Sequence, residues 1–261
     1  MQPAELDEAV ALLAAANEEA KIIAGGTALV IMLRNRLIAP ATLISLGRLQ
    51  ELRSIRHEAG QSCGGDEAQA FGKVGNVRVR HAATVGGNLS EADYASDPPC
   101  ALVALRARVK ARSVRGEREI PLTDLFKNFY ETALASDEIL TELIVPDPAP
   151  GSRAAYLKFI SRSSEDRPCV GMAVVLENES DGTCKNLRLV AGAVAEIPQE
   201  IAAAEALAHG KRLTDDLITE IAEAYAANIE PLSDLRGSAW YRKQIIAVLA
   251  RRALKQALAD S

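Results

Sequence analysis

A proline-rich break lies just past the middle of the chain. The segment 146–151, PDPAPG, places three prolines and a glycine within six residues, and prolines lack the N–H group that a helix interior or a central strand requires. Periodic apolar sequence continues on both sides of it, and 261 residues are enough for two parts that each bury a core. The break therefore predicts two domains, residues 1–149 and 150–261.

The charge balance argues against polyanionic partners. The formal net charge is −5 and aromatic residues make up 4% of the chain, which disfavours a nucleic-acid-binding surface. The sequence begins MQPAELDEAV, which lacks the basic and apolar regions of a signal peptide, and no run approaches 18 uncharged apolar residues. We therefore expect no transmembrane segment, no nucleic-acid partner and a cytoplasmic location.

The cysteines and histidines do not form a recognisable metal-binding pattern. The four cysteines show no CxxC spacing, and the three histidines are scattered along the chain. We expect no metal ligand within this chain, so any metal of the functional assembly must be held by a partner.

The N-terminal domain reads as two lobes, about 1–55 and 56–149. In the first lobe, the pattern predicts a helix over 4–16, a strand over 21–24 that ends at a Gly-Gly turn, a helix capped by Thr27, and a strand over 42–46. In the second lobe, a long segment rich in Gly, Asn and Ser is expected to be irregular. This irregular segment covers 74–97. Two paired strands are expected over 107–113 and 117–121, followed by a helix over 122–130 and a further strand over 139–145.

The C-terminal domain reads as a three-stranded sheet backed by helices. The expected strands cover 156–160, 169–177 and 187–193, and the expected helices cover 200–209, 214–226 and 239–259. The whole chain is therefore expected to have an α+β fold.

Two Gly-Gly turns are the clearest candidates for a binding function. One follows the strand over 21–24 and the other lies at 86–87, whereas neither a GxGxxG nor a GxxxxGK[ST] motif is present. A glycine turn before a helix leaves backbone N–H groups open to an anion. A single Gly-Gly pair is most often only a turn, but two together could clamp a diphosphate.

Five segments, in order along the chain, resemble the flavoprotein subunits of molybdenum hydroxylases, the medium-subunit family of xanthine dehydrogenase and carbon monoxide dehydrogenase. They are IIAGGTAL at 22–29, ATVGGNLSEADYASD at 83–97, DEILTELIVP at 137–146, YLKFISRSSED at 156–166 and RGSAWYRK at 236–243. The resemblance implies a two-lobed FAD-binding domain of the para-cresol methylhydroxylase type, followed by a smaller C-terminal domain.

The resemblance also implies a noncovalent FAD site and no catalytic residue in this chain. The implied cofactor-binding residues are Ile22, Ile23, Ala24, Gly25, Gly26, Thr27, Ala28 and Leu29 in the first loop, Thr84, Val85, Gly86, Gly87 and Asn88 in the second, and Asp97, Leu140 and Lys158. Asp97 would lie near the ribose and adenine, Leu140 beside the flavin, and Lys158 near the isoalloxazine ring. Without the resemblance, these three would read equally well as a helix N-cap, a core residue and a solvated amine.

The implied function is electron transfer within a complex. FAD would pass electrons from the [2Fe–2S] clusters of a small partner subunit to an external acceptor, and a large partner subunit would carry the molybdenum–pterin cofactor, in an assembly often doubled by symmetry. Two alternatives stay open: a stand-alone flavin oxidoreductase of the same fold, and a flavin-free scaffold subunit. The sequence leaves the substrate and the electron acceptor undetermined.

One region departs from the family pattern. Where the family usually carries a further strand and much of a helix, the sequence between 60 and 70 is short and reads QSCGGDEAQ. Either a natural deletion or the omission of a mobile segment explains this shortening, and it puts the pocket wall that leads into Val74 in doubt.

Overall fold

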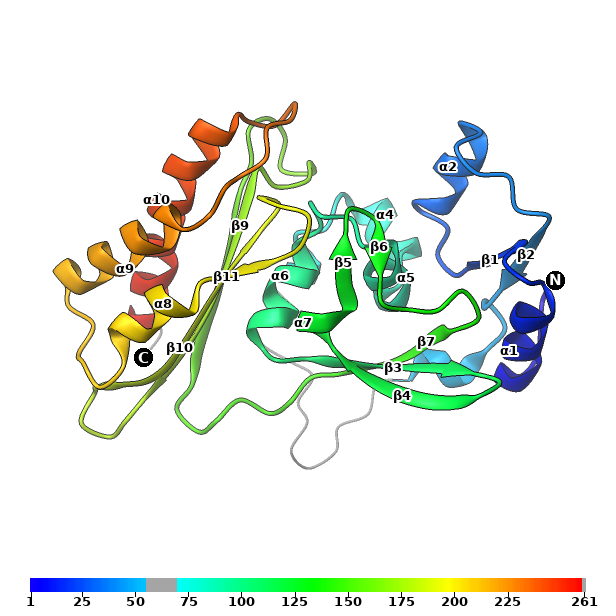
Figure 1. Ribbon diagram of the computed structural model, residues 1–261, viewed down its shortest axis with the longest axis horizontal. Coiled ribbons are helices and arrows are strands. Elements are labelled where there is room, and N and C mark those ends of the chain that lie inside the picture. Colours follow the sequence, from blue (N-terminus) through cyan, green and yellow to red (C-terminus); the bar gives the residue numbers. More distant parts are fainter. Residues whose placement is uncertain (55–69, 260–261) are drawn as a thin grey trace.

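The computed structural model describes residues 1–54 and 70–259. It is elongated, with the N-terminal lobe at one end and the C-terminal helices at the other (Figure 1). Helices are combined with strands that pair mostly in the antiparallel direction, so the α+β expectation is confirmed. The expectation about the short region between residues 60 and 70 falls outside the described residues.

The N-terminal lobe is a small parallel β/α unit. Its elements are α1 (Leu6–Ala15), β1 (Ala20–Ile23), α2 (Leu29–Arg34), β2 (Thr42–Ser45) and the 3-10 helix η1 (Gln50–Arg53). Strands β1 and β2 pair in parallel, with Ile22 opposite Ile44. The buried face of α1, which includes Val10 and Leu13, packs on this pair in one core. The expected Thr27 cap is wrong, because Ala28 occupies the N-cap position of α2 and no side chain caps that helix.

The middle lobe alternates short helices with antiparallel strands. Its elements are α4 (Val77–Ala82), α5 (Val85–Glu91), α6 (Asp97–Ala104), β3 (Arg108–Ser113), β4 (Gly116–Pro121), α7 (Leu122–Leu125), β5 (Phe126–Asn128), β6 (Glu131–Thr132) and β7 (Ile139–Ile144). One sheet has the strand order β4-β3-β7, and β5 pairs with β6.

Two expectations for this lobe are wrong. The segment 74–97 is not irregular, because Asn76 caps α4 and Thr84 caps α5 through their side chains, which supplies acceptors for otherwise unpaired helix N–H groups. The helix expected over 122–130 ends at Leu125, where the chain enters β5.

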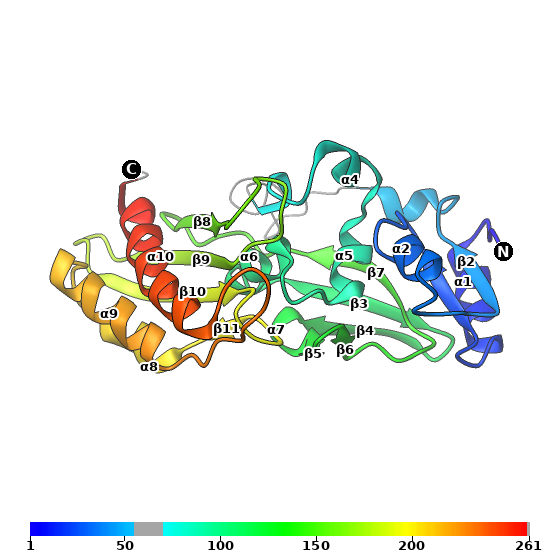
Figure 2. The same ribbon diagram turned by 90° about the horizontal axis from the view of Figure 1, so that it is seen from above.

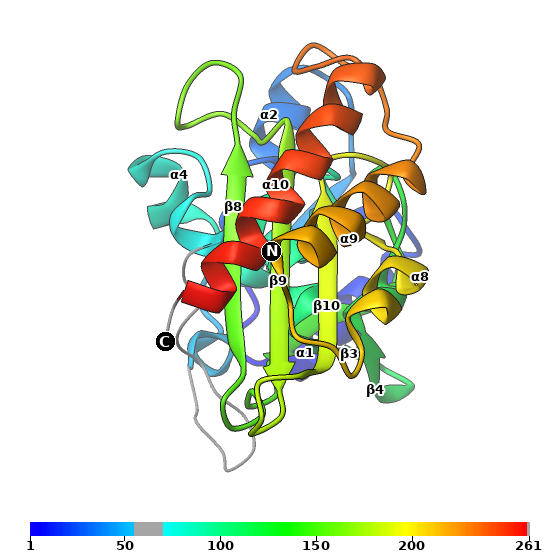
Figure 3. The same ribbon diagram turned by 90° about the vertical axis from the view of Figure 1, so that its left-hand side faces the viewer.

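The C-terminal domain is an antiparallel sheet covered by helices. Its strands are β8 (Arg153–Phe159), β9 (Val170–Asn178), β10 (Cys184–Gly192) and the two-residue β11 (Gln199–Glu200), and its helices are α8 (Ala202–Glu205), the 3-10 helix η2 (Ala206–Ala208), α9 (Asp215–Ala227) and α10 (Ala239–Ala259). Figure 3 shows α9 and α10 lying across one face of the sheet. The three expected strands are confirmed. The structure adds β11 at the edge and divides the helix expected over 200–209 into two short pieces.

Helix α6 covers the opposite face of this sheet. Every one of its residues is buried, and it contacts both β9 and β10. Figure 2 shows it between the C-terminal sheet and the middle lobe. A Cβ atom at Gly192 would lie 2.8 Å from Cys100 Cβ, so glycine at this position allows the helix to approach the sheet closely. The middle lobe and the C-terminal sheet therefore share one core, which places segments from both beside each other.

Neither a membrane-spanning helix nor a metal-binding cluster is found within residues 1–54 and 70–259. None of the helices there is long and apolar enough to cross a bilayer. No group of three or more His, Cys, Asp or Glu side chains in these ranges is placed to hold a metal ion.

Candidate functional site

The two Gly-Gly loops lie in direct contact. A Cβ atom at Gly25, in the first loop, would lie 2.1 Å from the carbonyl oxygen of Ala82 and 2.9 Å from Cα of Ala83. Residues 82 and 83 lead directly into the second loop, and only a glycine at position 25 lets the two backbones approach so closely. Segments about 60 residues apart in the sequence are therefore joined into one site.

The second loop forms the first turn of α5. The Gly87 N–H donates to Oγ1 of Thr84 at 3.1 Å, while the N–H groups of Val85 and Gly86, at the start of the helix, have no carbonyl one turn earlier in the helix to accept them. A Cβ atom at Gly86 would be 3.5 Å from the side chain of Leu140, so Leu140 lies directly behind this turn. The arrangement presents N–H groups on one side and an apolar support on the other.

Asn88 carries an acceptor that no described residue satisfies. Its Nδ2 donates to Oγ of Ser96 at 2.7 Å, but its Oδ1 is buried and has no hydrogen-bond partner in the described parts of the chain. A buried unpaired acceptor costs free energy. Oδ1 of Asn88 therefore fits a ligand that brings a hydroxyl or N–H donor to the second loop.

Asp97 and Lys158 form a buried ion pair beside that loop. Their side chains are 4% and 5% exposed, and Lys158 Nζ lies 2.9 Å from Asp97 Oδ2. Tyr156 Oη donates to the other carboxylate oxygen at 2.7 Å. Because its side chain is buried, the alternative interpretation of Lys158 as a solvated amine is wrong. The alternative of an N-cap for Asp97 is also wrong, because Ser96 occupies that position.

Burial shifts the pKa values of Asp97 and Tyr156. It raises the pKa of Asp97, and the hydrogen bond from Tyr156 and the charge of Lys158 oppose that rise. Burial, followed by the charge of Asp97, raises the pKa of Tyr156 well above its usual value. Tyr156 therefore stays a proton donor toward Asp97 at neutral pH.

Lys73 is a site neighbour that sequence reasoning missed. Its backbone carbonyl accepts a bond of 2.8 Å from Lys158 Nζ, and its own Nζ donates to the Tyr156 carbonyl at 3.0 Å. Burial lowers the pKa of Lys73, although the charge of Asp97 opposes this shift. The two lysines thus tie the segment before α4 to β8. No signal in the sequence pointed to Lys73, whereas the i, i+2 spacing of Tyr156 and Lys158 could have indicated their shared strand face.

The structure therefore groups the expected site residues in two connected sets. Residues of the first loop meet the second loop at Ala82 and Ala83, and Leu140 supports the second loop. The second set is the ion pair of Asp97 and Lys158. It is connected to the second loop because Asn88 donates a hydrogen bond to Ser96, the residue that precedes Asp97. Within the first loop, Ile22 faces the N-terminal core, Ile23 packs near Gly26, and Ala24 is exposed, while Thr27, Ala28 and Leu29 form the turn into α2.

A second network joins the middle lobe to the C-terminal domain. Tyr94 Oη donates to Asp234 Oδ2 at 2.8 Å, and Arg236 pairs with the same oxygen at 2.8 Å. The guanidinium of Arg242 is fully buried and lies 2.6 Å from Asp234 Oδ1. It also donates to the carbonyl of Cys169 at 3.0 Å. Sequence reasoning assigned these residues no role.

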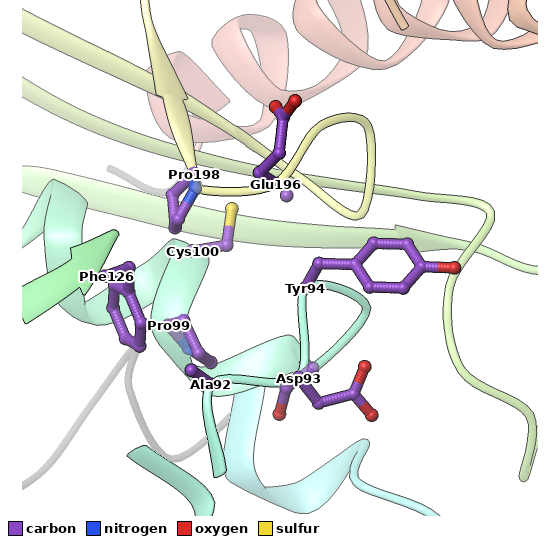
Figure 4. A pocket seen from close by; sticks show the side chains of 10 residues that line it. Ala92, Asp93, Tyr94, Pro99, Cys100, Phe126, Glu196 and Pro198 are labelled. Atoms are coloured by element: carbon purple, nitrogen blue, oxygen red, sulfur yellow. The ribbon is translucent and has the colours of Figure 1, made fainter. Parts of the chain in front are cut away.

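A cavity beside Tyr94 is too small for a cofactor. It holds about 10 Å³, room for roughly one water molecule, and its lining includes Asp93, Cys100, Phe126 and Glu196. In Figure 4 the ring of Tyr94 points away from Cys100 and Phe126. This cavity is therefore part of the packing between the lobe and the sheet.

The Asp234 network predicts a pH-dependent contribution to stability. Burial raises the pKa of Asp234, but the backbone N–H of Arg236 and the side chains of Tyr94 and Arg242 outweigh it and lower the pKa from 3.8 to about 2. Because the folded-state pKa is depressed, the carboxylate stabilises the fold above about pH 4, and this contribution is lost as the pH falls toward 2. Between pH 5 and pH 3 the native chain should lose about 1 kcal/mol more stability than Asp234→Asn. Urea unfolding at both pH values measures this difference, and equal losses in the two proteins would contradict the assignment.

Both halves of the chain match models of known protein families. Residues 1–65 and 61–148 match the model of the FAD binding domain in molybdopterin dehydrogenase. Residues 155–257 match the model of the CO dehydrogenase flavoprotein C-terminal domain.

Whole-chain relatives agree with these matches. The chain is 31% identical to the glyceraldehyde dehydrogenase medium chain of Sulfolobus acidocaldarius, over 92% of this chain and 91% of that protein. It is 32% identical to the nicotine 6-hydroxylase medium subunit of Paenarthrobacter nicotinovorans, over 98% and 95%. The structure of carbon monoxide dehydrogenase from Hydrogenophaga pseudoflava matches with a TM-score of 0.91 and 31% identity, covering 99% of this chain and 96% of that one. The chain therefore belongs to the family of FAD-binding medium subunits of molybdenum hydroxylases.

Proposed function

We propose that this chain binds FAD noncovalently and transfers electrons from the [2Fe–2S] clusters of a partner subunit to an external acceptor. The observation that carries the proposal is the contact of the two Gly-Gly loops at Gly25 and Ala82. It creates one backbone surface with open N–H groups, which suits a diphosphate. FAD, when bound, supplies the chemistry of accepting and releasing electrons.

The proposed roles of the site residues combine the family resemblance with their positions. Residues 22–29 and 84–88 hold the diphosphate between them, and Oδ1 of Asn88 accepts a hydrogen bond from the cofactor. Because Asp97 is ion-paired with Lys158, we place Asp97 at the same end of the cofactor as Lys158 and not beside the adenine, and Leu140 packs beside the flavin. Lys158 lies near the isoalloxazine ring, where a cation favours negative charge on the ring.

The ammonium of Lys158 suits a role near the isoalloxazine ring, because it is held in place and still has one unused hydrogen-bond donor. Two of its three N–H groups are used by Asp97 and by the carbonyl of Lys73, which leaves the third for the cofactor. Asp97 is itself fixed by Tyr156. These residues therefore orient the amine before any cofactor binds, which reduces the entropy cost of binding.

The proposed assembly contains two further subunits. We propose a small iron–sulfur subunit and a large molybdenum–pterin subunit, in a heterotrimer doubled by two-fold symmetry. We also propose that the FAD-binding part is residues 1–149 and that the C-terminal domain begins at residue 150. The buried free thiols of Cys100, Cys169 and Cys184 support a reducing compartment, and we propose the cytoplasm.

Removal of FAD from the assembled complex tests the electron-transfer role. We expect the FAD-depleted complex to reduce its iron–sulfur clusters with substrate while reduction of the external acceptor stops, and we expect added FAD to restore the second step. If acceptor reduction continues without FAD, the chain is a scaffold. If the isolated chain with FAD turns over a substrate by itself, the chain is a stand-alone oxidoreductase.

A further inference from the structure

Helix α2 is an apolar helix that nothing in the described chain covers. Its sequence is LVIMLR, and none of its residues is buried. Val30 and Ile31 are 43% and 58% exposed, and Leu37, in the turn that follows, is 70% exposed. Figure 1 shows α2 at the upper edge of the N-terminal lobe, standing away from the sheet of that lobe. Apolar side chains grouped in this way mark an interaction surface.

The charged residues closest to α2 along the sequence are basic, although Glu18 and Glu19 lie near residues 38–41, which follow the helix. All four charged residues between positions 20 and 50 are Lys or Arg, in a chain whose net charge is −5. Arg34 and Arg36 are exposed beside Ile31 and Leu37, and neither has an ion-pair partner among residues 1–54 and 70–259. The surface therefore complements an acidic face.

The backbone at Arg36 shows that its charge can be removed without straining the end of the helix. Helix α2 ends in a Schellman motif, with Arg36 N–H donating to the Leu33 carbonyl at 3.1 Å and Leu37 N–H donating to the Met32 carbonyl at 2.9 Å. This motif places Arg36 in the left-handed region with φ +57°, where glycine is the residue that avoids strain. A glycine at this position would relieve strain rather than add it, which makes Arg36 suitable for a test of the charge.

We propose that residues 30–37, which are the rest of α2 and the following turn, dock against an acidic face with an apolar centre on another subunit of the complex. This proposal rests on the proposed function, because it requires that the complex exists. The apolar centre is Val30, Ile31 and Leu37, and Arg34 and Arg36 form the charged rim. A nucleic acid suits this surface less well, because residues 20–50 contain no aromatic side chain on which a base could stack.

The variant Arg36→Gly tests docking without destabilising the fold. Glycine removes the charge and relieves the left-handed strain, so the unfolding midpoint should stay the same or rise. We expect the affinity of the purified FAD-loaded chain for the remaining subunits to fall roughly fivefold at low salt, and the difference to shrink as salt is added. Lys211→Ala is the matched control, because it removes one exposed positive charge from the C-terminal domain, and its affinity should be unchanged.

A second variant tests the apolar centre. Ile31→Ser/Leu37→Ser changes two exposed side chains, and we expect the affinity to fall roughly tenfold or more at every salt concentration.

Three results would overturn the proposal. The first is wild-type affinity in both variants. The second is loss of flavin from Arg36→Gly, which would assign this surface to the cofactor. The third is binding of single-stranded RNA or of anionic phospholipid vesicles that Arg36→Gly abolishes while subunit affinity is kept. A colourless wild-type chain that still docks through this surface would instead contradict the proposed function alone.

Discussion

Gly25→Ala is expected to empty the FAD site and to leave the rest of the fold intact. The new Cβ would lie 2.1 Å from the Ala82 carbonyl oxygen, which is a backbone atom that a side-chain rotation cannot relieve. The two loops must therefore separate, and a shift of this size misplaces the N–H groups that are proposed to hold the diphosphate. We expect less than about a tenth of the wild-type flavin content, which corresponds to a binding loss above about 1.4 kcal/mol. The ratio of flavin absorbance to protein concentration measures this effect.

Gly72→Ala is the matched control for this variant. It makes the same substitution at a glycine whose added Cβ meets no atom within 4 Å, and it should keep the wild-type flavin content. Circular dichroism of Gly25→Ala should match that of the wild-type chain prepared without FAD. Full flavin content in Gly25→Ala would show that the contact of the two loops does not form the binding site.

Lys158→Met is expected to cause a large loss of stability. The Lys158 and Asp97 side chains are about 5% and 4% exposed, and removing one partner of a buried ion pair leaves the other charge uncompensated. Such losses are about 3 to 5 kcal/mol. Urea unfolding of the chain without bound cofactor gives the free energy of unfolding directly.

The double variant Asp97→Asn/Lys158→Met separates the ion pair from simple packing. Asparagine removes the unpaired negative charge and still accepts the hydrogen bond from Tyr156, so the double variant should be more stable than Lys158→Met alone. A loss below about 1 kcal/mol in Lys158→Met, or a double variant less stable than the single one, would mean that the pair does not stabilise the core.

The sequence predicted the regular elements well where periodicity was strong. Helix α10, at Ala239–Ala259, has the expected bounds, and the three long strands of the C-terminal sheet lie within a few residues of their expected ranges. These elements bury a continuous apolar face, so their pattern reflects their environment. The two Gly-Gly pairs were found from residue identity alone, because adjacent glycines are easy to recognise in a sequence.

The errors have physical causes. The segment 74–97 was expected to be irregular because it is rich in Gly, Asn and Ser, yet the caps at Asn76 and Thr84 stabilise α4 and α5. The helix predicted over 122–130 ended early, because Phe126 is buried as part of β5.

Tertiary contacts were beyond the reach of the sequence. The contact between Gly25 and Ala82 and the bonds of Lys73 to β8 join residues that are more than 50 positions apart. Local pattern carries no information on such pairs. The same holds for Arg242, whose side chain is fully buried against Asp234 and two carbonyl groups.

The visible absorption spectrum of the purified chain is the most direct test of FAD binding. We expect the two bands of oxidised flavin and, after heat denaturation, release of FAD at close to one equivalent per chain. A chain that is colourless and also fails to bind added FAD would contradict the proposed FAD site and its electron-transfer role.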